Sequence, residues 1–208
     1  MARRGNSGLF AFLGLAGLAG WVISRAIAGS TSSSSAPDAA AASTESDLFA
    51  PVNPFDQGGA VNVLQLNTLT AQNSSLAQRR QAFAPYFEDS STRHALPDGL
   101  LARQGEVESQ LLPTARSQVG AVGIMQLMPR YFPNAGQDPV ADIETAAQEM
   151  ARLFSVFGSW TLALAGYNAG QGNVQSYGMR VPPFPETRAY IAKILPAVGI
   201  SEPDVAYA

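Results

Sequence analysis

The chain has 208 residues, a formal net charge of -3, no cysteine, and 46% hydrophobic against 14% charged residues. This length and apolar content allow one packed domain with extensions. The lack of cysteine excludes disulfides and thiolate catalysis, and the single histidine, His94, excludes a histidine metal cluster. Without a dense stripe of lysine and arginine, nucleic acid is not expected as a partner.

Residues 1–28 have the pattern of a targeting or anchoring segment. Two arginines precede an uncharged, largely apolar run, and Arg25 follows it. We favour an uncleaved signal-anchor, because the run reaches membrane-spanning length if Arg25 extends to the interface. A cleaved secretory signal peptide is the alternative, since small residues at 26–28 supply a cleavage site. Both interpretations place the rest of the chain across a membrane, whereas a buried core helix fits less well because the run has no polar face.

Residues 29–74 predict a flexible tether. The stretch from Gly29 to about Ser46 consists mainly of serine, alanine and threonine, and prolines and glycines follow it. Such a composition cannot bury enough apolar surface to offset the entropy lost on ordering. Only the segment VNVLQLNTL, residues 61–69, is expected to form a short ordered element within it.

Residues 75–208 predict a compact, all-α domain, or at most an α-dominated α+β domain. The longest expected helix has Asp142 as its N-cap and Gly158 as its closing residue, with apolar residues at helical spacing between them. Pro185 opens the last helix. Helices are expected over residues 77–91, 96–109, 142–157, 161–170 and 185–195.

Two glutamates stand close together in the sequence GEVES, residues 105–109. At roughly 100° per residue on a helix, Glu108 falls on the apolar arc between Leu101 and Leu111. Glu106 is turned away by about 200°, onto the face of Arg103. The two carboxylates should therefore point apart, with Glu106 solvated near Arg103.

An acid on an apolar helix face has a raised pKa, because burial disfavours the charged form. A carboxyl group that stays neutral near pH 7 is what general acid catalysis requires. The alternative is a structural glutamate held by backbone amides or lying at the rim of the core. Residues farther along the chain bear on this choice.

Polar residues occur in two later apolar segments. In SQVGAVGIMQLMP, Gly123 allows close approach of a ligand to the backbone, and Gln126 offers a donor and an acceptor suited to sugar groups. Equally, the neighbouring methionines and leucines could simply fill the core. In AGYNAGQGNV, Tyr167 and Asn168 interrupt a small, apolar helix. A buried tyrosine hydroxyl needs a partner, and a protonated Glu108 is the partner that we expect for Tyr167.

These segments together resemble the catalytic domain of the soluble lytic transglycosylase (SLT) family. The resemblance covers roughly residues 83–195 and runs through four collinear motifs. The motifs are VES at 107–109, SxxGAxGIMQLMP at 117–129, AGYNAGQGNV at 165–174 and PPFPETRAYIAKIL at 182–195. It implies a lysozyme-like helical fold.

The resemblance also implies a site and a reaction. It implies that Glu108 is the catalytic acid and base for non-hydrolytic cleavage of the MurNAc–GlcNAc bond of peptidoglycan, with formation of a 1,6-anhydro ring. It places the substrate at Ser117, Gly123, Met125, Gln126, Tyr167, Asn168, Glu186 and Tyr190. No metal or organic cofactor is expected, because the sequence shows no ligand cluster.

Two other functions remain open at this stage. One is a hydrolytic muramidase, in which water replaces the sugar's own hydroxyl, and the other is a non-catalytic protein that binds peptidoglycan. The expected location is the bacterial cell envelope, anchored to the membrane or exported to the wall side. A secretion apparatus, another envelope-spanning assembly or a phage virion is an alternative setting that the residues do not decide.

Overall fold

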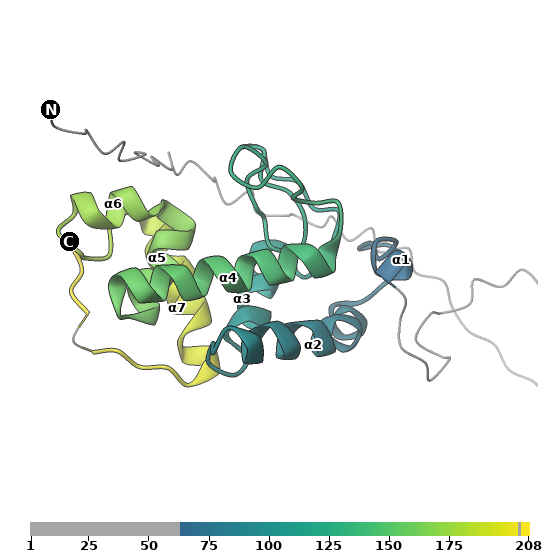
Figure 1. Cartoon of the computed structure of the whole chain (residues 1–208), viewed down its shortest axis with the longest axis horizontal. Helices are drawn as coiled ribbons and strands as arrows, with labels where there is room; N and C mark the ends of the chain where they lie inside the picture. Colours follow the sequence, from purple (N-terminus) through teal and green to yellow (C-terminus); the bar gives the residue numbers. More distant parts are fainter. Residues whose placement is uncertain (1–62, 204) are drawn as a thin grey trace, which may run out of the picture.

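The protein is described by a computed structural model covering residues 63–203 and 205–208 (Figure 1). Within these residues the structure is helical, and extended pairing is limited to isolated bridges such as Arg116 with Val122. The all-α prediction is therefore confirmed for the described part of the chain. Its helices are α1 (Val63–Leu66), α2 (Leu76–Arg93), α3 (Leu100–Ser109), α4 (Pro139–Phe157), α5 (Trp160–Ala169), α6 (Gln171–Ser176), α7 (Pro185–Ile194) and the short 3-10 helix η2 (Pro196–Val198).

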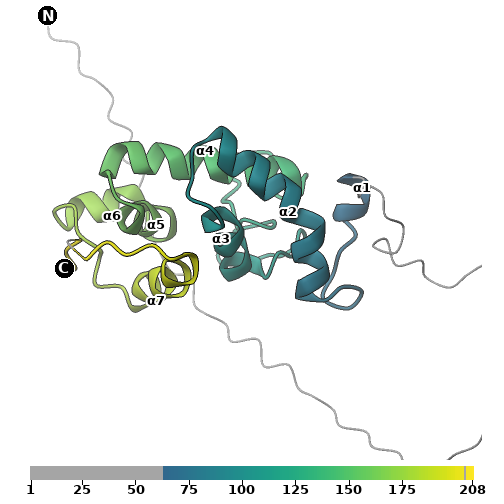
Figure 2. The ribbon, with the colours of Figure 1, turned by 90° about the horizontal axis from the view of Figure 1, so that it is seen from below.

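Helix α3, which carries both glutamates of the GEVES segment, lies in the middle of the bundle. It packs against α2, α4 and α7, which surround it in the view of Figure 2. Leu100, Leu101, Gln104 and Gly105 are its buried residues. The helix ends in two consecutive left-handed residues, Gln110 and Leu111, so the chain turns sharply away just after Ser109.

The long helix α4 begins earlier than the sequence pattern indicates. Asp138, rather than Asp142, is the N-cap: its Oδ1 accepts hydrogen bonds from the backbone N–H groups of Val140 at 2.8 Å and Ala141 at 3.4 Å. Pro139 occupies the first turn, where its missing N–H is not needed. The predicted end is confirmed, because Gly158 adopts φ 66 and closes the helix.

Asp142 instead holds the long loop between α3 and α4. It lies within the first turn of α4, is 2% exposed, and both its carboxylate oxygens accept from the N–H of Gly136 at 3.0 Å. Burial raises its pKa to about 6, against the opposing effect of the Gly136 hydrogen bond. A Cβ added at Gly123 would lie 2.1 Å from Asp142 Oδ2, so only glycine fits there.

The buried core starts before residue 75, where the sequence places the domain boundary. Leu66 at the end of α1 and Leu69 beyond it are 0% and 2% exposed and belong to the core. Ser75 then caps α2 in a reciprocal arrangement with Gln78. The predicted short ordered segment is thus part of the packed domain, because its leucines face inward.

The predicted anchor at 1–28 and most of the predicted tether lie outside the described residues. From residue 63 onward, none of the described helices has the length and apolar character needed to cross a bilayer.

The carboxyl-terminal segment secures the start of α5. Glu202 accepts hydrogen bonds from the Ser159 hydroxyl at 2.6 Å and from the backbone N–H groups of Trp160 and Thr161 at 2.9 and 2.8 Å. A carboxylate at this position satisfies unpaired amides and complements the helix dipole. Helix α5, with Tyr167 and Asn168 near its far end, is thereby fixed at its start.

Candidate active site

The two glutamates of α3 have different environments, as their helical phase predicts. Glu106 forms ion pairs with Arg80 Nε at 2.5 Å and Arg103 Nη1 at 2.9 Å. These arginines hold the pKa of Glu106 below its usual range, against the effect of burial. Its side chain is only 13% exposed, so the expectation of a fully solvated glutamate is corrected: Arg80, from α2, covers it. Glu106 serves a structural ion-pair network.

Glu108 points toward α7, where Tyr190 donates a hydrogen bond from its hydroxyl to Glu108 Oε1 at 2.6 Å. Desolvation raises the pKa of Glu108 to about 8, although the bond from Tyr190 acts in the opposite direction. The negative charge of Glu186, in the first turn of α7, adds to the increase. The residue as a whole is half-buried and its carboxyl group is enclosed by protein, so the acid stays mostly protonated at pH 7.

Tyr167 does not pair with Glu108, which corrects the partner expected from the sequence. Its hydroxyl donates to the backbone carbonyl of Met125 at 2.9 Å. The charge of Glu108 still acts on Tyr167: together with burial, it raises the phenol's pKa well above the usual value. Burial and the charge of Glu108 do the same for Tyr190. Both tyrosines therefore remain neutral hydrogen-bond donors around the acid.

The glycine-containing loop supplies backbone groups as well as side chains. Met125 is fully buried and contributes its carbonyl group, while its side chain packs in the core. Gln126 has a left-handed backbone with φ 50, and its Nε2 donates to the carbonyl of Gly123 at 2.9 Å. This leaves the carbonyl oxygen of the Gln126 side chain as the acceptor that it can offer to a ligand.

Two further residues expected at the site, Ser117 and Asn168, have local hydrogen-bond partners. Ser117 Oγ accepts from the N–H of Ala121 at 2.9 Å and stabilises the turn before the loop. Asn168 Oδ1 accepts from the Thr187 hydroxyl at 2.7 Å, which ties α5 to α7. Burial raises the pKa of Glu186. Of the predicted residues, Glu108, Tyr190, Glu186 and Tyr167 thus share one electrostatic environment.

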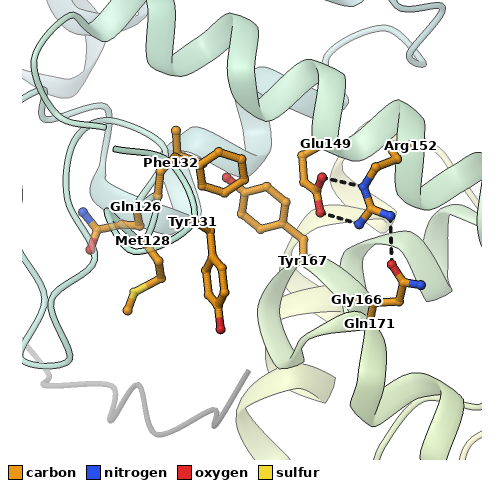
Figure 3. Close-up of a pocket in the computed structure, with 10 residues that line it drawn as sticks. Gln126, Met128, Tyr131, Phe132, Glu149, Arg152, Gly166, Tyr167 and Gln171 are labelled. Carbon is orange, nitrogen blue, oxygen red and sulfur yellow. Dashed lines mark hydrogen bonds and ion pairs between the residues drawn. The ribbon is translucent and has the colours of Figure 1, made fainter. Parts of the chain in front are cut away.

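A pocket of about 500 Å³ opens beside Tyr167 (Figure 3). Glu108 is not among the residues that line it, but Tyr167, on which the charge of Glu108 acts, is. The loop contributes Gln126, Leu127, Met128, Tyr131 and Phe132, and helices α4, α5 and α6 contribute Glu149, Arg152, Gly166, Tyr167 and Gln171. Of these residues, only Gln126 and Tyr167 are predicted from the sequence. Glu149 and Arg152, three residues apart on a helix, have the pattern of an ordinary surface pair.

Gln104 is another residue that the sequence did not single out. It is 0% exposed, one helical turn before Glu108, and neither atom of its amide has a hydrogen-bond partner among the described residues. It lies near enough to lower the pKa of the Tyr190 phenol, although the pair does not meet hydrogen-bond geometry. An unpaired polar group is thus buried close to the phenol of Tyr190.

Comparison with known proteins identifies the class of this domain. Residues 85–186 match the sequence model of the Transglycosylase SLT domain, and this domain belongs to that family. The resemblance recognised from the four motifs is thereby confirmed.

Two curated relatives are named "Membrane-bound lytic murein transglycosylase D", from Escherichia coli K12 and from Escherichia coli O6:H1. Each is 34% identical over 112 residues, which cover 43% of this chain and 25% of the relative. The chain therefore spans about a quarter of the length of the relatives that it matches. A solved structure of the lytic transglycosylase Slt from Pseudomonas aeruginosa, an inactive mutant, aligns with 22% identity and a TM-score of 0.49, covering 70% of this chain and 29% of that one.

Proposed function

We propose that this protein is a peptidoglycan lytic transglycosylase that uses Glu108 as its only carboxylate for proton transfer. The observation that carries the proposal is the enclosed carboxyl group of Glu108, whose pKa is raised to about 8 and whose Oε1 is held by Tyr190 at 2.6 Å. Family membership supports the same conclusion, because the relatives matched are named as murein transglycosylases.

In the first step, protonated Glu108 donates its proton to the oxygen that bridges N-acetylmuramic acid and N-acetylglucosamine. The bond between this oxygen and C1 of the muramoyl sugar breaks, and positive charge develops at C1. The muramoyl N-acetyl group stabilises that charge. Tyr190 stabilises the carboxylate left on Glu108, because a hydrogen bond to a charged acceptor is stronger than one to a neutral acceptor.

In the second step, the carboxylate of Glu108 takes the proton from the 6-hydroxyl of the same muramoyl sugar. The 6-oxygen forms a bond to C1, which closes the 1,6-anhydro ring and regenerates protonated Glu108. No water is consumed. One carboxylate is sufficient because the substrate supplies the nucleophile, unlike the two-carboxylate scheme of most glycosidases.

The neighbouring polar residues are proposed to bind the glycan. Gln126 and Tyr167 line the pocket of about 500 Å³, and Asn168 lies on the same helix as Tyr167. Glu186 lies at the start of α7 and raises the pKa of Glu108. Ser117, Gly123 and Met125 shape this wall of the site, mainly through the loop backbone.

The proposed location is the wall side of the bacterial envelope, where peptidoglycan occurs. The relatives matched are named as membrane-bound, and a membrane anchor at residues 1–28 is a proposal from the sequence. A flexible connection between such an anchor and the domain would let the site reach glycan strands. Participation in a secretion apparatus, another envelope assembly or a phage particle is a further proposal.

The experiment is digestion of purified peptidoglycan, with mass spectrometry of the soluble fragments. The proposal predicts 1,6-anhydro ends, which are lighter by one water molecule than the reducing ends left by a hydrolase. Glu108→Gln should abolish release. Reducing ends would instead establish a muramidase, and binding to peptidoglycan without release would establish a non-catalytic protein.

A second variant, Glu186→Gln, separates the two chemistries further. Glu186 is the other carboxylate whose charge acts on Glu108, so it is the residue to test as the base of a hydrolytic reaction. In the proposed mechanism Glu186 transfers no proton, and the variant should keep forming anhydro ends. Loss of all cleavage in Glu186→Gln, with substrate binding intact, would contradict the single-carboxylate mechanism.

A further inference from the structure

The pocket beside Tyr167 has two chemically different sides (Figure 3). Met128, Tyr131 and Phe132 form the apolar side, and they come from the loop that follows Gln126. Glu149, Arg152 and Gln171 form the opposite, polar side, which belongs to α4 and α6. An apolar surface facing a small set of fixed polar groups is typical of a ligand site.

The polar side is held together by hydrogen bonds around the guanidinium group of Arg152. Its Nε and Nη2 both donate to the carboxylate of Glu149 at 2.7 Å, and its Nη1 donates to Gln171 Oε1 at 2.8 Å. The arginine is thus fixed from two directions, although its side chain is 48% exposed. Such prior ordering reduces the entropy lost when a ligand binds.

The fixed guanidinium still has hydrogen-bonding capacity. Arginine has more N–H donors than these bonds use, so Nη1 and Nη2 each retain one. Because Gln171 presents its oxygen to Arg152, its amide nitrogen remains as a further donor. The polar side therefore offers N–H donors to a ligand.

Charge favours a neutral ligand group over an anion. Glu149 raises the pKa of Arg152, so the arginine stays protonated, and the two formal charges cancel. A ligand carboxylate would gain little binding energy from this neutral pair, and it would be repelled by the nearby carboxylate of Glu149. A carbonyl oxygen accepts the same N–H donors without repulsion.

We propose that Arg152 and Gln171 recognise the acetamide group of a glycan sugar bound in this pocket, with the acetamide carbonyl accepting hydrogen bonds from both side chains. The apolar face of the sugar ring packs on Tyr131 and Phe132. Arg152 is then a residue that determines specificity for acetylated sugars, at a distance from the proton transfer. The inference rests on the proposed function in that both require a glycan of N-acetylated sugars.

The experiment is isothermal titration calorimetry with chitotetraose, a β-1,4-linked tetramer of N-acetylglucosamine. The inactive Glu108→Gln protein serves as the background, so that the ligand is not consumed. Arg152→Met removes the donors and keeps an extended apolar side chain. Arg93→Met is the matched control, because Arg93 is also ion-paired and has a similar side-chain exposure of 50%, but lies outside the pocket.

Arg152→Met should weaken chitotetraose binding by about tenfold, the effect expected for loss of a hydrogen bond to a charged group near the surface. Arg93→Met should leave it unchanged. Cellotetraose lacks the acetamide groups, so its affinity should not be lowered by Arg152→Met in the Glu108→Gln background. Unchanged chitotetraose binding in Arg152→Met, or an equal loss for both sugars, would overturn the proposal.

The outcome is separable from that of the proposed function. If the wild-type protein releases anhydro fragments from peptidoglycan while Arg152→Met binds chitotetraose normally, the function stands and the sugar pocket is refuted. If no cleavage occurs but chitotetraose binding depends on Arg152, the pocket stands and the catalytic proposal fails.

Discussion

Replacing Glu108 with glutamine should change how stability depends on pH. The folded protein raises the pKa of Glu108 from the reference value of 4.5 to about 8. Between these values the folded state binds more protons than the unfolded state, so stability falls as pH rises. The contribution of protonated Glu108 is fully present below about pH 4.5 and is lost by about pH 8. Glutamine cannot ionise, and its side-chain oxygen can still accept from Tyr190.

The magnitude follows from the shift. At about 1.4 kcal/mol per pKa unit, the wild type should lose up to about 3 kcal/mol relative to Glu108→Gln between pH 4.5 and 7. The residue keeps partial solvent exposure, which screens its charge, so we expect about half of this limit. The buried Asp142 also titrates in this range, but it is present in both proteins and cancels in the difference.

The assay is urea unfolding of both proteins at several pH values from 4.5 to 8.5. Glu108→Gln should become progressively more stable than the wild type as pH rises, with the difference levelling off above pH 8. A difference that does not vary with pH would show that Glu108 titrates normally in the folded protein. Glu108 would then be ionised at pH 7 and could not act as the general acid.

Three further changes test the site and its support. Tyr190→Phe removes the hydrogen bond that lowers the pKa of Glu108, so the alkaline decline of kcat/KM should move to higher pH by up to about one unit; a move to lower pH would contradict the assigned role. Glu106→Gln should lower the free energy of unfolding by about 1 kcal/mol through its lost ion pairs. The rate of peptidoglycan release should change by less than about twofold. A large loss of rate would mean that the two glutamates cooperate. Gly120→Ala should cost about 1–2 kcal/mol, because alanine is strained in a left-handed backbone. Gly123→Ala should cost clearly more, because a Cβ there also meets a carboxylate oxygen of the buried Asp142. Equal melting temperatures for the two variants would refute this packing.

Several features of the site follow from local sequence alone. The spacing of apolar residues in α3 places Glu108 and Glu106 on different faces, since successive residues on a helix are turned by a fixed angle. The ends of α4 and α7 show the same locality: Gly158 closes one helix because it accepts a left-handed backbone, and Pro185 opens the other. These predictions succeed because backbone geometry links residues only a few positions apart.

The start of α4 shows how local signals can mislead. Asp138 and Asp142 are both acceptable N-caps in sequence, and each is followed by apolar residues at helical spacing. Asp142 is drawn instead into contact with Gly136, under the loop that contains Gly123. Packing of that loop decided which aspartate caps the helix.

By itself, the sequence determined an all-α domain and a single inward-facing acid in Glu108, because helical period and turn chemistry act over a few residues. Only the tertiary structure decided what surrounds the acid. Tyr190, 82 residues away, became its hydrogen-bond partner, while Tyr167 turned to the carbonyl of Met125. The tertiary structure also brought Arg152 and Gln171 together in one wall of the pocket. Such contacts depend on how α3 to α7 pack against one another, and no short-range pattern encodes that packing.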